Sequence, residues 1–467
     1  MPAFRFALRW LPPLLMLLPA AARANDLLRL YRLAQQRDTV LQAAQYQRDA
    51  AIEARPQALA QWLPLLSGNA STERERLTEP AAEFGITPQE SATLPSLGSG
   101  LPGCELANTV TVGCDVNYTT YGLTLTQTLW SFQSYSQLKE ADSQAASAEA
   151  TYRSAQQDLV VRVAQAYFAV LQAQDLLTTF TDERAAYATL LKQSQGREQT
   201  GVGSASDVKQ AQAYYDQSAQ NLISAQNGLD DARLALDEII GAPAGHIAPL
   251  REQIPLAAPD PVSADAWVAS ARSDNPAIRA AELSTDAAQH DIGVQRGRGL
   301  PTLSLTGQEL YATAPSVLGG HHGLDTVGVY FNWPLFQGGA VASAVRQSRA
   351  LYREDEANLE SLRRQTEQQT RTAYLNIVTG IRSINAAGRA VDSARAAVEA
   401  AQRDIEFDVG NEYALLGYQG LYYSAVYTYA AARYAYLNNV LLLKQQAGRL
   451  GEQDVAAIDA LLVTGGG

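Results

Sequence analysis

The chain has 467 residues, enough for two or three ordinary domains, and its formal net charge is −12. An acidic chain without a basic tract lacks the cations that neutralise nucleic-acid phosphates, so the composition argues against a DNA- or RNA-binding protein. Beyond the N-terminal segment, no apolar run approaches the length of a transmembrane helix, roughly 20 residues. Any part of the mature protein that enters a membrane must therefore do so as β-strands.

Residues 1–24 have the three regions of a secretory signal peptide. Arg5 and Arg9 supply the basic region, residues 11–18 form an apolar stretch that prolines interrupt, and residues 22–24 (Ala-Arg-Ala) form a small-x-small cleavage site. The apolar stretch is too short to span a membrane. We therefore expect the chain to be exported from the cytoplasm.

The chain repeats itself once: residues 38–67 align without gaps on residues 275–304, and both segments carry a Leu-Pro pair near their ends. Each half predicts a helix, a strand, a loop, a strand, a very long helix, a turn and a long helix. A Pro-rich connector separates the halves. The signal peptide, first structural repeat, connector, second structural repeat and C-terminal tail are expected at residues 1–24, 25–240, 241–262, 263–450 and 451–467.

Four long helices are expected in tracts that are rich in Ala, Gln, Leu and Glu and free of Pro. Their apolar residues recur at alternating spacings of three and four, the coiled-coil period, as at Leu138, Ala141 and Ala145. Alanine at many of these positions buries little apolar area, so each helix needs neighbours on more than one side. We therefore predict a curved wall of helices. They are expected at residues 133–197, 204–240, 339–408 and 412–447.

Four short segments alternate between apolar and small or polar residues, which is the period of a half-buried strand. In the clearest one, Val327, Val329 and Phe331 alternate with Gly328 and Tyr330. The alternation alone favours a soluble sheet packed on a core, whereas the export signal and the lack of another globular core favour membrane strands. The strands are expected at about residues 65–74, 118–130, 302–311 and 327–336.

Four strands cannot close a barrel, and open strand edges cannot face lipid. Since about eight strands are the fewest that close well, several copies must share one barrel. The residues leave two copies with eight strands and three copies with twelve strands both open. The expected fold class is mainly α, with long coiled helices and a shared membrane β-barrel.

Cys104 and Cys114 lie in a stretch rich in Gly, Pro, Ser and Thr. Two closely spaced cysteines in an exported chain predict a loop-closing disulfide. A metal site at the cysteines is the weaker alternative, because no His and no second Cys pair accompanies them. Elsewhere, the neighbouring residues His321 and His322 alone complete no coordination shell. The sequence holds no catalytic constellation, so no enzyme activity, cofactor or bound metal is expected.

The duplicated order of elements resembles the TolC family of outer-membrane efflux and secretion channels. The resemblance covers nearly the whole mature chain. It implies a homotrimer with a twelve-stranded barrel in the outer membrane of a Gram-negative bacterium and an α-helical tunnel in the periplasm. The segments that resemble the family are Gly122 to Trp130, Gly328 to Phe336, Asn275-Pro276, Ala432 to Leu437 and Gly451 to Asp454.

The same resemblance implies a passive exit duct of a tripartite efflux pump or a type I secretion system. Such a duct docks on an inner-membrane transporter through a periplasmic adaptor protein, and it exports drugs, toxins or proteins. The tips of the helix hairpins would form the periplasmic entrance and contact the adaptor. Glycine at each tip permits the backbone reversal. The tip residues are Thr200, Gly201, Val202, Val409, Gly410 and Asn411.

The candidate gate departs from the family pattern. In the best-known members an aspartate, a tyrosine and an arginine hold the entrance closed. Here Asp207 matches the aspartate, but Phe407 stands at the tyrosine position and Glu412 at the arginine position. Leu416 and Gln419 replace the paired aspartates that line the constriction. The family's gate and acidic ring are therefore not expected in this chain.

Asp207 and Glu412 are expected close together at the tip, where they would repel each other unless a basic residue intervenes. Arg197 and Lys209 are the local candidates. The abundant tyrosines between residues 413 and 436 have helical spacing, which favours packing between helices over an aromatic binding cage.

The alternative function is a periplasmic coiled-coil scaffold or adhesion protein without channel activity. It would explain the heptad pattern but would leave the four strands and the duplication without a purpose. Neither the exported substrate nor the partner pump is predicted by the residues.

Overall fold

The computed structural model describes residues 27–80, 104–108, 111–313, 321–407 and 410–463, so the predicted signal peptide lies outside the described residues. The chain forms two compact units, and each unit takes segments from both halves of the sequence. A helical unit comprises residues 1–44, 153–275 and 364–467, and a sheet-bearing unit comprises residues 45–152 and 276–363. The helices α5 (Phe132–Gln199) and α9 (Ala340–Glu406) run through both units.

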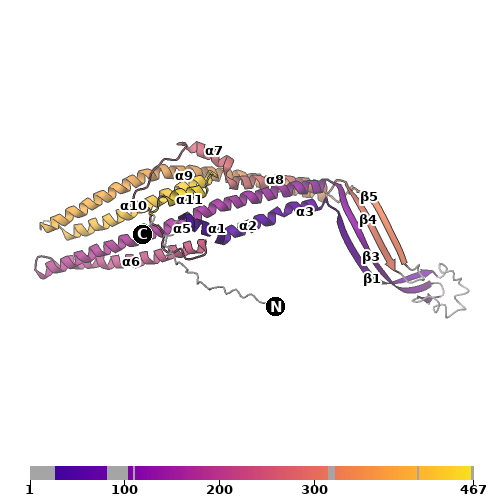
Figure 1. The fold of residues 1–467 in the computed structure, drawn as a ribbon, viewed down its shortest axis with the longest axis horizontal. Helices are drawn as coiled ribbons and strands as arrows, with labels where there is room; N and C mark the ends of the chain where they lie inside the picture. Colours follow the sequence, from indigo (N-terminus) through magenta and orange to yellow (C-terminus); the bar gives the residue numbers. More distant parts are fainter. Residues whose placement is uncertain (1–26, 81–103, 109–110, 314–320, 408–409, 464–467) are drawn as a thin grey trace, which may run out of the picture. The chain divides into compact units, whose positions relative to one another are not determined.

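The sheet-bearing unit contains an antiparallel sheet in the order β1-β3-β4-β5, with β2 paired to β3 (Figure 1). In this order the two main strands of each sequence repeat are neighbours. The two repeats are joined where β3 of the first pairs with β4 of the second. In the described part of the chain, β1 and β5 each have one unpaired edge. The strands are β1 (Leu65–Pro80), β2 (Cys104–Asn108), β3 (Thr111–Ser131), β4 (Thr302–Thr313) and β5 (His321–Asn332).

One face of this sheet is largely apolar and open, although Glu309 and Asp325 also lie on it. Tyr121 and Leu125 of β3 share the face with Val327, Val329 and Phe331 of β5, and Val327 is 82% exposed. The alternate positions carry small polar residues such as threonine. None of the described residues of this unit covers the face, so this broad apolar surface requires an apolar environment.

Close strand packing requires Gly122, one of the residues that resembled the TolC family. A Cβ atom at this position would lie 2.5 Å from the carbonyl oxygen of Glu309 on β4. Only glycine lets β3 and β4 approach to this distance.

The strand ends differ from the predicted ones. The strand predicted at 327–336 begins earlier, at His321. It ends earlier too, at Asn332, because Pro334 has no N–H to continue the ladder. β1 and β3 extend beyond the predicted 65–74 and 118–130, because they pair with each other from Pro80↔Thr111 onwards. β4 joins β3 only from Thr119, and β2 pairs with β3 beyond that point.

Helices lead into the first strand of each repeat, α2 and α3 into β1 and α8 into β4. α2 ends at Ile52, since Pro56 has no N–H to bond the Ile52 carbonyl. In the sheet-bearing unit Arg55 forms an ion pair of 2.8 Å with Asp142 of α5. α8 ends against the start of α5, where a Cβ at Gly297 would lie 2.5 Å from the Cα of Gln133. The helices are α2 (Thr39–Ile52), α3 (Ala54–Ala60) and α8 (Pro276–Gly297).

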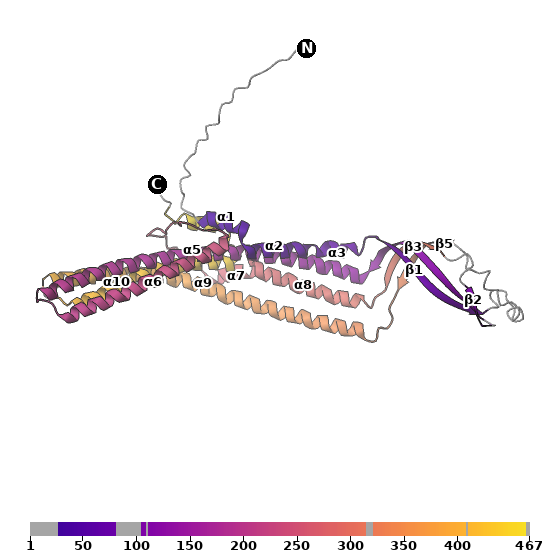
Figure 2. The same ribbon diagram turned by 90° about the horizontal axis from the view of Figure 1, so that it is seen from below.

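The helical unit contains two helical hairpins. In both views α6 runs back alongside α5, and α10 runs back alongside α9 (Figure 1 and Figure 2). Ser204 caps α6 and Asn411 caps α10. Among the described helices, none combines the length and apolarity needed to cross a bilayer. The remaining helices are α1 (Leu27–Arg37), α6 (Ala205–Ile240), α7 (Ala264–Asp274), α10 (Glu412–Gln446) and α11 (Glu452–Asp459).

The heptad positions predicted to pack are buried at many points. These include Leu159, Val163 and Val170 of α5, and Leu229 and Leu236 of α6. The predicted C-terminal tail is itself structured, because α11 packs on α1 and Leu462 forms a β-bridge with Leu250 of the connector. α1 thus packs on both α11 and α6.

Candidate functional site: the hairpin tips

The turn between α5 and α6 is a tight reversal at residues 200–204. Gly201 has a φ of 76°, a left-handed conformation that favours glycine. The N–H groups of Val202 and Gly203 both donate to the Arg197 carbonyl, at 3.0 and 2.9 Å. Val202 projects from this turn and is 63% exposed. The predicted tip residues of the first hairpin therefore lie together on one exposed turn.

The turn between α9 and α10 also depends on glycine. A Cβ at Gly410 would lie 2.6 Å from the backbone nitrogen of Ile405. The Asn411 side chain accepts a 2.8 Å hydrogen bond from the Tyr413 N–H, which starts α10. Val409 lies outside the described residues. Phe407, before the turn, is exposed.

Asp207 has a local role at the start of α6. Its N–H donates to the Ser204 hydroxyl, and its carboxylate accepts from the Ser204 N–H, both at 3.2 Å. This reciprocal arrangement is a capping box. The carboxylate predicted as a gate residue therefore has an N-cap partner in its own helix.

Glu412 is the first residue of α10, and its side chain is only 11% exposed. One carboxylate oxygen lies 3.5 Å from Nε of Arg197 in the last turn of α5. The other accepts a hydrogen bond from the Ser194 hydroxyl, one turn earlier in α5. Of the two basic candidates, Arg197 and not Lys209 forms the observed ion pair with Glu412. The expected repulsion between Asp207 and Glu412 is therefore replaced by separate pairings.

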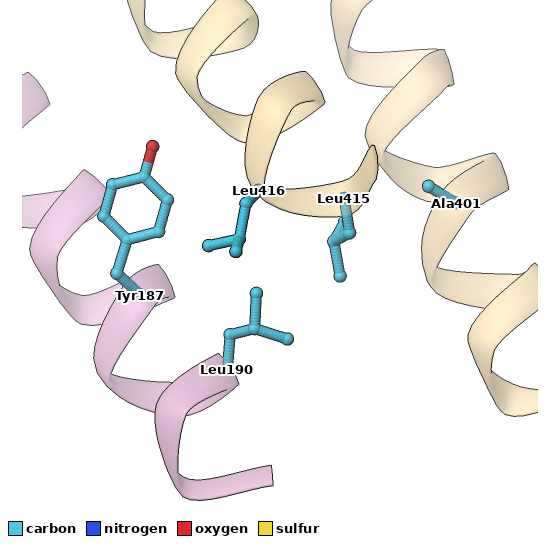
Figure 3. Close-up of a cluster of buried hydrophobic side chains, with 5 residues drawn as sticks. All are labelled: Tyr187, Leu190, Ala401, Leu415 and Leu416. Atoms are coloured by element: carbon cyan, nitrogen blue, oxygen red, sulfur yellow. The ribbon is translucent and has the colours of Figure 1, made fainter. Parts of the chain in front are cut away.

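Leu416 and Gln419, the positions of the family's paired aspartates, are buried at 1% and 6% exposure. Leu416 packs in an apolar cluster with Leu415 of α10 and with Tyr187 and Leu190 of α5 (Figure 3). Ala401 of α9 completes the cluster (Figure 3). Leu416, which stands where the family pattern has an aspartate, thus helps to fill the space between the hairpins with apolar side chains.

A groove of about 700 Å³ opens beside this cluster, between α5, α9 and α10. Arg197 and Glu412 both line it. Gln419 also lines the groove, and its buried Oε1 atom has no hydrogen-bond partner among the described residues. The lining residues include Thr189, Gln193, Arg197, Gln402, Glu406 and Glu412.

Tyrosines of α10 attach that helix to α5 along its length. Tyr423 donates to the Asp182 carbonyl at 3.1 Å, and the Tyr427 hydroxyl accepts from the Gln172 amide at 3.0 Å. Burial raises the pKa of Tyr423 to about 12, so its hydroxyl keeps its proton at physiological pH. The preference for packing over an aromatic cage is confirmed for these residues.

Beneath the apolar cluster, α5 carries a buried acid. Glu183 accepts a 3.2 Å hydrogen bond from the Tyr187 hydroxyl, and its second carboxylate oxygen has no hydrogen-bond partner in the part of the chain that the structure describes. Burial raises the pKa of Glu183 above its ordinary value, an effect that the Tyr187 bond only partly offsets. Sequence reasoning missed this residue, because a single acid on a helix resembles a solvated one.

The two cysteines lie at paired backbone positions of β2 and β3. The backbone register pairs Cys104 directly with Cys114. Directly opposed residues of antiparallel strands are close enough for a disulfide. The disulfide itself stays a prediction. In the described part of the chain, no group of three or more His, Cys, Asp and Glu side chains could hold a metal ion.

The comparisons with known proteins follow the duplicated architecture. The model of the family "Outer membrane efflux protein" matches residues 30–242 and 267–449, one block in each repeat. The outer membrane protein TolC of Vibrio cholerae is 30% identical over 450 residues, covering 95% of both chains. The alkaline protease secretion protein AprF of Pseudomonas aeruginosa is 29% identical and covers 75% of this chain and 74% of its own.

Solved structures share the fold. A membrane protein from Pseudomonas aeruginosa superposes with a TM-score of 0.76 at 20% identity, covering 92% of each chain. The matches in sequence and structure assign the chain to the outer membrane, with its helices forming the periplasmic part. The chain belongs to the outer membrane efflux protein family, the family of TolC, and is an outer-membrane channel for efflux or type I secretion.

Proposed function

We propose that three copies of this chain form one exit duct, in which each copy contributes four strands to a twelve-stranded barrel. The duct receives drugs, toxins or proteins from an inner-membrane transporter through a periplasmic adaptor. Transport is passive within the duct itself. The family is one of transport channels and not of enzymes.

The observation that carries this proposal is the sheet with two unpaired edges and an open apolar face. Backbone groups immersed in hydrocarbon must be hydrogen-bonded, and about eight strands are the fewest that close a barrel. Pairing of β5 in one copy with β1 in the next would satisfy both edges. The number three comes from the family resemblance.

The periplasmic entrance in this proposal lies at the two hairpin tips, around Val202 and Asn411. Exposed apolar side chains support an adaptor contact there, since Val202 and Phe407 project into solvent from the ends of α5–α6 and α9. Such isolated apolar groups at a rigid helix end are suited to insertion between the helices of a partner.

Planar-bilayer conductance of the detergent-extracted protein tests the channel, and a Val202→Cys variant tests the entrance. A bulky thiol reagent should reduce the conductance of this variant and leave that of the unmodified chain unchanged. Ile223→Cys is the matched control, since Ile223 is also exposed but lies in the middle of α6. Release of the protein from cells by salt or osmotic shock, with no conductance, would support the scaffold alternative.

A further inference from the structure

The sheet ends at β1 on one side and at β5 on the other, and each of these strands has one unpaired edge in the described part of the chain (Figure 1). We propose that β5 of one copy pairs with β1 of the next in a single register, which places Asp325 opposite Arg74 of the partner subunit. This inference rests on the proposed shared barrel. It deepens that proposal by assigning the strand register and an ion pair that joins the copies.

The two faces of the sheet restrict the register to every second position. Even-numbered residues of β1 and odd-numbered residues of β5 lie on the largely apolar face. A slip by one residue would bring the apolar residues of β5 to the polar face of β1. An even-numbered residue of β1 must therefore lie opposite an odd-numbered residue of β5. On this face β1 carries Leu66, Gly68, Ala70, Thr72 and Arg74, and β5 carries Asp325, Val327, Val329 and Phe331.

The strand ends give the direction in which the next copy is displaced. Within one copy Gly68 of β1 lies level with Asp325 of β5, because the backbone pairs run through Leu123 and Glu309. β5 continues for seven residues beyond Asp325, whereas β1 begins only three residues before Gly68. The next β1 must therefore be displaced towards the end of β5 to pair with it.

The strand tilt limits the size of this displacement. The strands rise about 3.3 Å per residue and lie about 4.8 Å apart. Displacements of two, four, six and eight residues over four strands then correspond to tilts of roughly 19°, 35°, 46° and 54°. Membrane strands are tilted by roughly 35–45°. Displacements of four and six residues fit this range.

Charge decides between these two displacements. Glu309 of β4 lies directly opposite Asp325 of β5 on the largely apolar face, and like charges at opposed positions destabilise a sheet. A displacement of six residues places Arg74 of the partner subunit at the level of Asp325, where its guanidinium compensates the two carboxylates. A displacement of four residues places Thr72 of the partner subunit there, which supplies no charge.

The shapes of the two strand edges agree with the larger displacement. The small residues Gly68 and Ala70 of β1 leave a hollow of about 420 Å³ on the largely apolar face, beside Tyr121. Phe331 and Val329 of β5 are 66% and 61% exposed on this face. With a displacement of six residues, Phe331 lies opposite Gly68 of the partner subunit. Val329 then lies opposite Ala70 of the partner subunit, so both large side chains fill the hollow.

Cysteine cross-linking of the full-length protein in outer membranes tests the register. Val329→Cys is combined in turn with Ala70→Cys, Gly68→Cys and Thr72→Cys, which report displacements of six, four and eight residues. Directly opposed residues of antiparallel strands are within reach of a disulfide, whereas residues two positions away are not. Because β3 and β4 separate β1 from β5 within one copy, a disulfide between these positions joins two copies.

We expect oxidation to link the copies of V329C/A70C with a yield on the order of tenfold above those of V329C/G68C and V329C/T72C. The single cysteine variants are the controls for exchange with Cys104 and Cys114. A higher yield from either of the other two pairs would overturn the register. No cross-link from any pair would overturn the pairing of β5 with β1.

A charge exchange tests the ion pair. Arg74→Asp should lower the assembled fraction on semi-native gels on the order of tenfold, since the repulsion recurs at every junction between copies. The double variant R74D/D325R restores opposite charges and should return assembly towards that of the unmodified chain. Arg76→Asp is the matched control, because Arg76 is exposed on the same face but lies opposite Gly323 in this register. An equal loss in R76D, or no recovery in R74D/D325R, would refute the ion pair.

Failure of the shared barrel is distinguishable from failure of the register. Without a shared barrel the extracted protein would be monomeric, and the unmodified chain would give no conductance in planar bilayers. With a shared barrel in another register, conductance persists and the cross-link forms through a different cysteine pair.

Discussion

Tyr434 on α10 donates a hydrogen bond of 2.7 Å to the carboxylate of Asp175 on α5. Burial raises the pKa of both groups, so the phenol remains a donor over the physiological range. The neighbouring Arg433 donates to the Arg251 carbonyl in the connector. These contacts join α5, α10 and the connector away from the hairpin tips.

We expect Tyr434→Phe to destabilise the protein by about 1–3 kcal/mol, because the Asp175 carboxylate loses its donor. Thermal unfolding in detergent measures the effect. Tyr418→Phe is the control, since Tyr418 is exposed on the same helix. Equal melting temperatures for the two variants would show that the Asp175 bond contributes nothing.

Glu183→Gln should stabilise the protein at neutral pH but not in acid. The folded pKa of Glu183 is raised above its ordinary 4.5 by burial. The folded state therefore binds this proton more tightly than the unfolded state, and stability falls as pH rises through the interval between the two pKa values. Below that interval both proteins carry an uncharged side chain and should melt alike.

The measurement is the difference in melting temperature between E183Q and the unmodified chain at pH 4 and at pH 8. Gln keeps an acceptor for the Tyr187 hydroxyl, so the hydrogen bond survives in the variant. Glu399→Gln, at an exposed position of α9, is the control and should show no such pH dependence. A difference for E183Q that does not change with pH would contradict the assigned cause.

Arg162→Gln should be strongly destabilising, by about 3–5 kcal/mol, because it leaves the Asp38 carboxylate buried without its partner. The two guanidinium nitrogens lie 2.9 and 2.8 Å from the two Asp38 oxygens. Arg233→Gln is the control, since Arg233 forms an exposed pair with Asp230. Chemical denaturation compares the two variants, and similar losses would contradict the prediction.

The same ion pair has a defined pH dependence. Burial opposes ionisation of Asp38, but the bonds from Arg162 and from the Leu41 N–H outweigh it and lower the pKa below its ordinary 3.8. The contribution of the pair is therefore complete above the unfolded pKa and is lost as pH falls through the folded one. The destabilisation caused by R162Q should shrink in strong acid.

Gly122→Ala should reduce assembly of the sheet, because the added Cβ would clash with the Glu309 carbonyl on β4. We expect the assembled fraction in outer membranes to fall about tenfold, as a loss of one to two kcal/mol gives. Gly68→Ala is the matched control, since its Cβ would lie at an ordinary 3.5 Å from the Leu123 side chain. Semi-native gel electrophoresis measures the assembled fraction, and equal assembly would refute the packing role.

Cys104 and Cys114 should be unreactive towards a thiol reagent in the denatured, unreduced protein, and reactive after reduction. Their direct pairing across β2 and β3 is the structural reason. Labelling before reduction would show that the predicted disulfide is absent.

The sequence alone determined the periodic features of this protein. The alternation around Val327 and the heptad spacing around Leu159 depend on local order along the chain, and so do the tip glycines Gly201 and Gly410. Period and backbone reversal are local properties, so they predicted where the long helices, the turns and four strands lie, but not where the strands end. The internal sequence repeat also predicted the order in which these elements follow one another.

Only the tertiary structure decided which side chains meet. Ser194 and Glu412 are 218 residues apart, and nothing in either segment specifies that α5 faces α10 at that position. The burial of Leu416, the buried acid Glu183 and the strand β2 likewise depend on contacts between distant segments. A helix or strand pattern specifies which face is apolar, but the partner of that face follows from the packing of the whole unit.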